Sequence, residues 1–278
     1  MLIQAVLSSK ASGYDSEDIL TSTVFGTLKY LRPDIVLIPF LELAFLYNED
    51  KTALWQTLKS EGVELRCYRE IEYIFWPRNI SYGEPDLIIL FKNHIHGDDD
   101  YLLVIEVKLK SEKSGIEDKD QLVRYYEAIV NDIENFSEPS ISSFNGKKGH
   151  IIYLTQTTSH SEINASLKLL ENKYEIIKNQ LFHLRWQQLF KTFENMKEFC
   201  SDIEERIIDD LIKYLDKLGL RDFSGISLPH ESLVEEFLLQ RPVFYRDTLA
   251  NKEKKTFFDN LDIELSHEGI IFYREEQI

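Results

Sequence analysis

Two short apolar runs joined by a polar turn constrain the fold more than any other part of the chain. The first is residues 87–91 (LIILF), preceded by residues 83–86 (GEPD), and the second is residues 101–107 (YLLVIEV). Aliphatic runs of this length bounded by Gly, Asp and Pro are typical of strands. Pro85 also favours an extended conformation at the residue before it, which suits a strand start. The sequence therefore predicts two adjacent antiparallel strands.

Charged residues gather at one end of this predicted hairpin. Asp86 opens the first strand, and Glu106 and Lys108 lie near the end of the second. Residues two apart in a strand share a face, so Glu106 and Lys108 point together while Val107 points the other way. Carboxylate oxygens suit Mg²⁺ or Mn²⁺, and we expect one of these ions as the cofactor. Such an ion can polarise a phosphodiester and activate a water, with Lys108 orienting that water or stabilising charge at the phosphate.

Asp86 and the tripeptide Glu106-Val107-Lys108 resemble the motif of the PD-(D/E)xK nuclease superfamily, also called restriction-endonuclease-like. The resemblance implies that Asp86 and Glu106 bind the metal together with the main-chain carbonyl of Val107, and that Lys108 is catalytic. Nucleases of this superfamily often carry another acid on the first core helix, which makes Glu17 a further candidate ligand. The alternative interpretation of Glu17 is a first-turn acid that complements the helix dipole.

Gln121 and Tyr125 lie four residues apart in a predicted helix and resemble the QxxxY motif of the RecB-like branch, seen in DNA-end-processing and defence nucleases. The resemblance implies that Gln121 assists catalysis and that Tyr125 buttresses the helix or contacts a phosphate. The alternative places both on the helix surface or at the rim of the core.

Lys147 and Lys148, in a loop predicted over residues 138–149, form a small basic cluster. That cluster is a candidate for contacting a nucleic-acid backbone, with a solvated loop as the alternative.

Hydrophobic periodicity predicts the order helix, three strands, helix, strand, helix, strand, helix. This matches the αβββαβ core of the superfamily, an α/β fold with a mixed central sheet flanked by helices. Residues 1–195 are predicted to form this core, and residues 196–278 a mainly helical C-terminal extension of unknown role, either packed on the core or separate. The predicted elements are a helix from residue 16 to Pro33, helical structure over 36–60, strands at 65–75, 87–91, 101–107, 149–155 and 181–186, and helices at 120–136, 162–178, from 186, at 203–218 and at 230–240, with strand character within 257–273.

Composition limits the partners and the compartment. The net charge of −16 over 278 residues weighs against indiscriminate nucleic-acid binding, and it indicates either tight control of access to the site or a partner protein that supplies DNA binding. Cys67 and Cys200 form no CxxC pair, which fits a reducing, cytoplasmic setting. No signal peptide is visible, and the longest apolar stretch, residues 35–47, is too short to span a bilayer, so we expect no membrane partner.

These observations favour a metal-dependent nuclease that acts on DNA rather than RNA. The second hypothesis is a binding or regulatory module that keeps the fold without cleavage, since a fold does not fix a function. The third is an acidic adaptor in which the motif is accidental. It predicts that the hairpin is absent or that Asp86 and Glu106 point apart.

Overall fold

The computed structural model describes residues 16–46, 51–93, 100–109, 120–156, 160–173 and 180–221, together with two short strands near the C-terminus. The chain forms two compact units, Met1–Asp222 and Phe223–Ile278. In the second unit, β7 (Ile263–Leu265) pairs antiparallel with β8 (Ile271–Tyr273), so the strand character predicted there is confirmed. The helix predicted over 230–240 lies outside the described residues.

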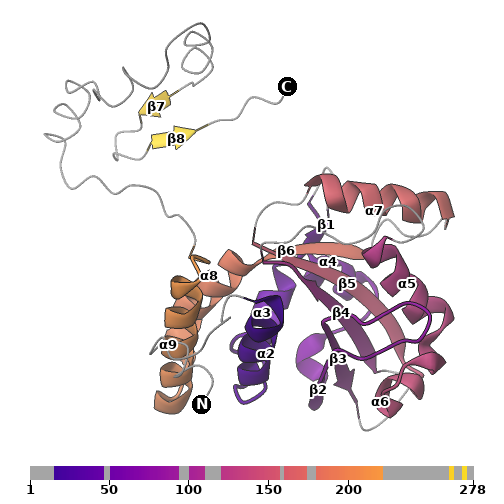
Figure 1. Ribbon diagram of the computed structural model, residues 1–278. Coiled ribbons are helices and arrows are strands. Elements are labelled where there is room, and N and C mark those ends of the chain that lie inside the picture. Colours follow the sequence, from indigo (N-terminus) through magenta and orange to yellow (C-terminus); the bar gives the residue numbers. More distant parts are fainter. Residues whose placement is uncertain are drawn as a thin grey trace, which may run out of the picture. The chain divides into compact units, whose positions relative to one another are not determined.

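A six-stranded mixed sheet forms the centre of the first unit, in the order β1-β6-β5-β4-β3-β2 (Figure 1). Strands β2, β3 and β4 pair antiparallel, β4, β5 and β6 pair parallel, and β1 runs antiparallel to β6. The expected α/β class with a mixed sheet is therefore confirmed. The strands are β1 (Phe45–Leu46), β2 (Glu70–Phe75), β3 (Leu87–Lys92), β4 (Tyr101–Val107), β5 (Lys147–Thr155) and β6 (Leu181–Arg185).

Helices cover both faces of the sheet (Figure 1). They are α2 (Glu17–Leu28), α3 (Leu37–Glu42), α4 (Leu54–Ser60), α5 (Gln121–Asn131), α6 (Pro139–Ser142), α7 (His160–Lys173), α8 (Trp186–Met196) and α9 (Asp202–Lys217). No described helix is long and apolar enough to cross a membrane.

Alternation along the strands divides the buried residues into two cores. Leu87 and Ile89 of β3 belong to the core shared with α2, α3, α4, α8 and α9. Ile88 and Leu90 belong to the core shared with α5, α6 and α7. Consecutive residues of a strand face opposite sides of the sheet. A strand covered by helices on both sides therefore needs an unbroken apolar run, as the sequence has at β3.

Three local predictions were wrong. The helical region expected over 36–60 is interrupted by β1, a two-residue edge strand too short to leave a sequence pattern. The strand expected from residue 65 begins only at Glu70, after a 3-10 turn over Leu65–Cys67. Residues 147 and 148 were predicted to lie in a loop, but they open β5.

Helix α9 packs on the core although the predicted core ended at residue 195. Ile208, Leu211 and Leu215 are fully buried in the same cluster as the apolar residues of α2. Arg32, which follows α2, donates from Nε to Glu204 Oε1 of α9 at 3.0 Å. The compact unit accordingly extends past α9 to Asp222.

Candidate active site

Asp86 and Glu106 meet where β3 begins and β4 ends. Leu87 pairs with Ile105, so the next residue on each strand, Asp86 and Glu106, lies directly across the pair. The main-chain N–H of Val107 donates to Asp86 Oδ2 at 2.7 Å, and the two carboxyl groups interact directly. The hairpin is present and the carboxyl groups converge, which is the opposite of what an accidental motif predicts.

The pair of carboxyl groups is poorly solvated. The Glu106 side chain is 1% exposed, and this burial together with the charge of Asp86 raises the pKa of Glu106 to about 8. Burial also raises the pKa of Asp86, although the Val107 N–H and the charge of Lys108 oppose the shift. Glu106 Oε2 is buried with no hydrogen-bond partner in the described part of the chain. In the metal-free protein the carboxyl pair therefore holds a proton more tightly than two separate, exposed carboxyl groups would.

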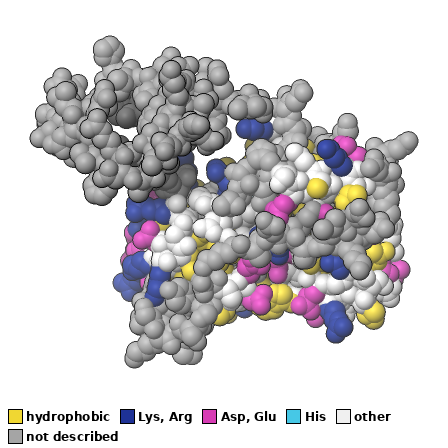
Figure 2. All heavy atoms as spheres, turned by 45° about the horizontal axis from the view of Figure 1, so that its top comes forward, with side chains coloured by type: hydrophobic (Ala, Val, Ile, Leu, Met, Phe, Trp, Pro, Cys, Tyr) yellow, Lys and Arg dark blue, Asp and Glu magenta, His cyan; other side chains and the backbone are white. Residues whose placement is uncertain are grey.

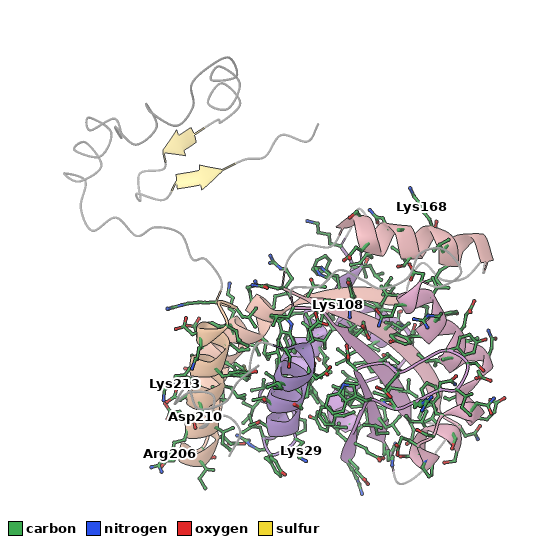
Figure 3. The ribbon with its side chains drawn as sticks, viewed as in Figure 1. Lys29, Lys108, Lys168, Arg206, Asp210 and Lys213 are labelled. Atoms are coloured by element: carbon green, nitrogen blue, oxygen red, sulfur yellow. The ribbon has the colours of Figure 1, made fainter. Side chains whose placement is uncertain are left out.

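Lys108 joins the carboxyl groups of two different elements. Its Nζ donates to Glu106 Oε1 at 2.7 Å and lies 3.6 Å from Glu17 Oε2. Burial opposes the charged form, but the carboxylates of Glu106, Glu17 and Asp86 outweigh it and raise the pKa of Lys108. In Figure 3, Lys108 lies at the end of the sheet, whereas the labelled residues of α9 lie at the outer edge of the first unit.

Glu17 reaches the motif from the first turn of α2. Its Oε1 accepts the main-chain N–H of Leu109 at 3.0 Å, directly after Lys108. Glu17 is therefore a first-turn acid of α2 and, at the same time, a neighbour of Lys108. However, no three His, Cys, Asp or Glu side chains in the described ranges are grouped closely enough to hold a metal ion.

Gln121 and Tyr125 connect α5 to the start of β3. Gln121 Nε2 donates to Tyr125 Oη at 2.9 Å, and Tyr125 Oη donates to the carbonyl of Glu84 at 2.8 Å. Asp120 caps the helix by accepting the N–H of Leu122 at 3.1 Å. Tyr125 is only 3% exposed, which argues against the phosphate contact that the QxxxY resemblance allows. The hydrogen bonds instead fix the backbone two residues before Asp86.

Replacing Tyr125 with Phe should lower the free energy of unfolding by about 1 kcal/mol, because the part-buried hydrogen bonds that its hydroxyl makes with Gln121 and the Glu84 carbonyl are lost. Urea unfolding followed by circular dichroism measures the change. Tyr30→Phe is the matched control, since Tyr30 is 73% exposed and the same atom is removed there into water. Equal stability of Tyr125→Phe and the wild-type protein would contradict the assigned hydrogen bond.

Lys147 and Lys148 lie at the opposite end of β5 from the carboxyl groups. Lys147 pairs with Tyr101 at the start of β4, whereas Tyr153 pairs with Glu106 near its end. With a rise of about 3.3 Å per residue, the two positions on β5 are about 20 Å apart. The predicted basic cluster is therefore remote from the carboxyl pair, and its side chains lie outside what the structure describes.

Two residues near the site were missed from the sequence. Tyr153 lies beside Glu106 on the neighbouring strand, and its hydroxyl donates to Glu162 Oε2 on α7 at 3.1 Å. Burial, Glu162 and the charge of Glu106 raise the pKa of Tyr153. Strand alternation identifies Tyr153 as an inward residue, but only the pairing of β5 with β4 shows that it adjoins Glu106.

The shifted pKa of Glu106 makes the metal-free protein sensitive to pH. An acid whose pKa is raised on folding contributes stability that is complete below its unfolded value, here 4.5, and is lost as pH rises through about 8. In EDTA, we expect the unfolding free energy of the wild type to fall across this pH window relative to that of Glu106→Gln. The expected difference is at least about 2 kcal/mol, because one unit of pKa shift corresponds to about 1.4 kcal/mol. Urea titrations between pH 5 and 9 give the difference, and parallel profiles for the two proteins would contradict it.

The chain matches no protein-family model, no curated protein and no solved structure. The fold and the arrangement at the ends of β3 and β4 therefore carry the functional argument.

Proposed function

We propose that this chain is a metal-dependent nuclease with a restriction-endonuclease-like core that hydrolyses phosphodiester bonds in DNA. The observation that carries the proposal is the pair of the part-buried Asp86 and the buried Glu106 where β3 begins and β4 ends, with the charged Lys108 paired to Glu106. Two adjacent carboxyl groups with raised pKa values are costly to a fold unless a ligand compensates them. The resemblance of the motif to PD-(D/E)xK nucleases supports the same conclusion.

The residues present fit a divalent ion. Glu106 Oε2 has no hydrogen-bond donor among the described residues. The candidate ligand atoms at this place are carboxylate oxygens, the hard ligands that Mg²⁺ and Mn²⁺ prefer. Asp86 and Glu106 would hold the ion, with the carbonyl of Val107 as a further ligand in the pattern of the superfamily. When bound, the ion supplies Lewis acidity toward the phosphodiester and the attacking water.

The surrounding side chains have separate roles in this proposal. Lys108 holds a positive charge next to the carboxyl pair, where it stabilises the charge that develops on the phosphate or orients the water. Glu17 keeps Lys108 in position through its 3.6 Å ion pair. Gln121 and Tyr125 hold the Glu84 backbone and so set the position of Asp86. In this scheme Gln121 acts by positioning.

The net charge of the protein bears on how strongly the isolated chain binds DNA. On the face shown in Figure 2, Lys and Arg side chains are interspersed with Asp and Glu side chains. With a net charge of −16, we expect weak and salt-sensitive binding of DNA by the isolated chain. A partner protein that supplies DNA binding is consistent with this charge.

The test is incubation of the purified chain with linear DNA, circular DNA and RNA, each with Mn²⁺, Mg²⁺ or EDTA. We expect cleavage of DNA that requires the divalent ion. Cleavage of the linear form alone would assign an end-dependent activity, and cleavage of the circle an internal one. A chain that binds Mn²⁺ by calorimetry but cuts none of the three substrates is instead the binding or regulatory module.

A further inference from the structure

Arg124 on α5 has no acidic partner among the residues that the structure describes. Within the described residues its guanidinium makes no ion pair or hydrogen bond, and its Nε is buried without an acceptor. Exposed arginines are satisfied by water, but a buried donor without an acceptor costs free energy. The terminal nitrogens Nη1 and Nη2 are not among the buried unpartnered atoms, so the open end of the guanidinium remains accessible. The Nε end of the guanidinium is thus buried, while its terminal nitrogens are accessible and have no partner among the described residues.

This guanidinium lies beside the candidate active site. A Cβ placed on Gly83 would lie 3.5 Å from Arg124 Nη1, so the fork rests against the backbone three residues before Asp86. Gly83 has φ 100°, a conformation that favours glycine. The next residue of α5, Tyr125, donates to the Glu84 carbonyl and fixes the helix to the same loop.

The loop under Arg124 is itself firmly held. Asn79 and Gly83 exchange two main-chain hydrogen bonds of 2.8 and 3.0 Å. The side chain of Asn79, which is 1% exposed, donates to the Asp132 carbonyl at the end of α5 at 3.0 Å. The loop is thus hydrogen-bonded to Asp132 at the C-terminal end of α5 and, through Glu84, to Tyr125 within the helix.

We propose that Arg124 binds a phosphate group of the nucleic-acid strand, adjacent to the phosphate at Asp86 and Glu106. This inference rests on the proposed nuclease function. A planar guanidinium fork matches two phosphate oxygens at once. Lys108 is already paired with Glu106 and Glu17, so it does not supply a free cation for a second phosphate. Arg124 supplies that charge at the border of an otherwise acidic site.

The test compares Arg124→Gln and Arg124→Lys with the wild type, and Arg206→Gln is the matched control. Arg206 is exposed on α9 (Figure 3), so the control loses the same charge away from the site. The probe is a fluorescein-labelled single-stranded DNA oligonucleotide, titrated by anisotropy in Ca²⁺ at several salt concentrations, and cleavage is measured in Mn²⁺. Thermal unfolding of each variant confirms that it is folded.

Arg124→Gln should weaken oligonucleotide binding and raise KM by roughly 10-fold with little change in kcat, and it should lower the slope of log K against log salt by about one. Arg124→Lys should restore the salt slope but only part of the affinity, because it keeps the charge and loses the fork. A merely structural role would not change the salt slope. Arg206→Gln should behave as the wild type.

The outcomes separate this inference from the nuclease proposal. If the wild type cleaves DNA and Arg124→Gln retains its affinity, KM and salt slope, the Arg124 inference fails alone. If Arg124→Gln weakens binding but the wild type cleaves nothing, the nuclease proposal fails and the phosphate contact stands. If the wild type does not bind the oligonucleotide, the phosphate contact is overturned. If Arg124→Gln does not fold, the oligonucleotide affinity of Arg124→Lys becomes the test. An Arg124→Lys variant that binds the oligonucleotide as tightly as the wild type would overturn the bidentate contact.

Discussion

Replacing Asp86 with Asn should abolish Mn²⁺ binding and lower DNA cleavage by at least about 10²-fold, the scale for losing one preorganised group, while the fold is retained. The amide oxygen of Asn can still accept the N–H of Val107, which Asp86 Oδ2 now accepts at 2.7 Å. Its NH₂ group can donate to the carboxyl group of Glu106, with which Asp86 interacts directly. A neutral amide, however, is a far poorer ligand than a carboxylate for a hard dication.

This substitution also predicts an effect on stability that separates a binding defect from misfolding. The charge of Asp86 is one cause of the raised pKa of Glu106, so removing it should let Glu106 ionise at lower pH. The variant should therefore be at least as stable as the wild type at pH 8 in EDTA. Calorimetric Mn²⁺ titration, a cleavage assay and urea unfolding are run together, with Asp202→Asn on the exposed start of α9 as control. Cleavage at the wild-type rate by Asp86→Asn would refute the nuclease assignment.

Replacing Lys108 with Met should leave Mn²⁺ binding but lower cleavage by roughly 10²-fold or more. Met keeps most of the aliphatic stem of Lys108, whose side chain is 11% exposed, and removes the ammonium group. Loss of this charge affects the metal site in two opposite ways. It removes a cation that repels the metal, and it removes the stabilising partner of the ionised Glu106.

The second effect gives the substitution a distinctive pH dependence. Lys108 is a cause that lowers the pKa of Glu106, so in Lys108→Met that pKa should rise further and protons should compete more strongly with the metal. Mn²⁺ affinity of the variant should thus approach or exceed the wild-type value at pH 9 and fall off more steeply toward pH 7. Lys213→Met, 63% exposed on α9, is the control. Unchanged cleavage would remove Lys108 from the mechanism, and complete loss of Mn²⁺ binding at pH 9 would make its role structural.

The sequence was sufficient for elements whose signal is local. The hairpin of β3 and β4 could be predicted because residues 87–91 and 101–107 are apolar except for Glu106 and are bounded by Gly, Pro and Asp. The start of α2 could be predicted because Ser16 is followed by acids, and its side chain does accept the Ile19 N–H at 3.3 Å. The short strand β1 could not, since two residues carry no period and pair only because β6 offers an edge.

For the candidate site, spacing along one strand placed Glu106 and Lys108 on one face, and the hairpin placed Asp86 beside them. The environment of these residues was set by the tertiary structure. The raised pKa of Glu106, the hydrogen bond from Tyr125 to the Glu84 carbonyl, and the Tyr153–Glu162 contact all depend on which helices cover that face. The distance of Lys147 and Lys148 from the site depends on the parallel register of β5 against β4.

By itself, the sequence determined the α/β class and the identity of the charged residues at the hairpin end, because alternation and turn chemistry act over a few neighbouring residues. Only the tertiary structure decided that Glu17 reaches Lys108, that Tyr125 positions the loop before Asp86, and that Arg124 Nε is buried without an acceptor among the described residues. These contacts join residues that are distant in the chain, and they arise when both faces of the sheet are covered. Burial there changes the cost of each charge, which no local pattern records.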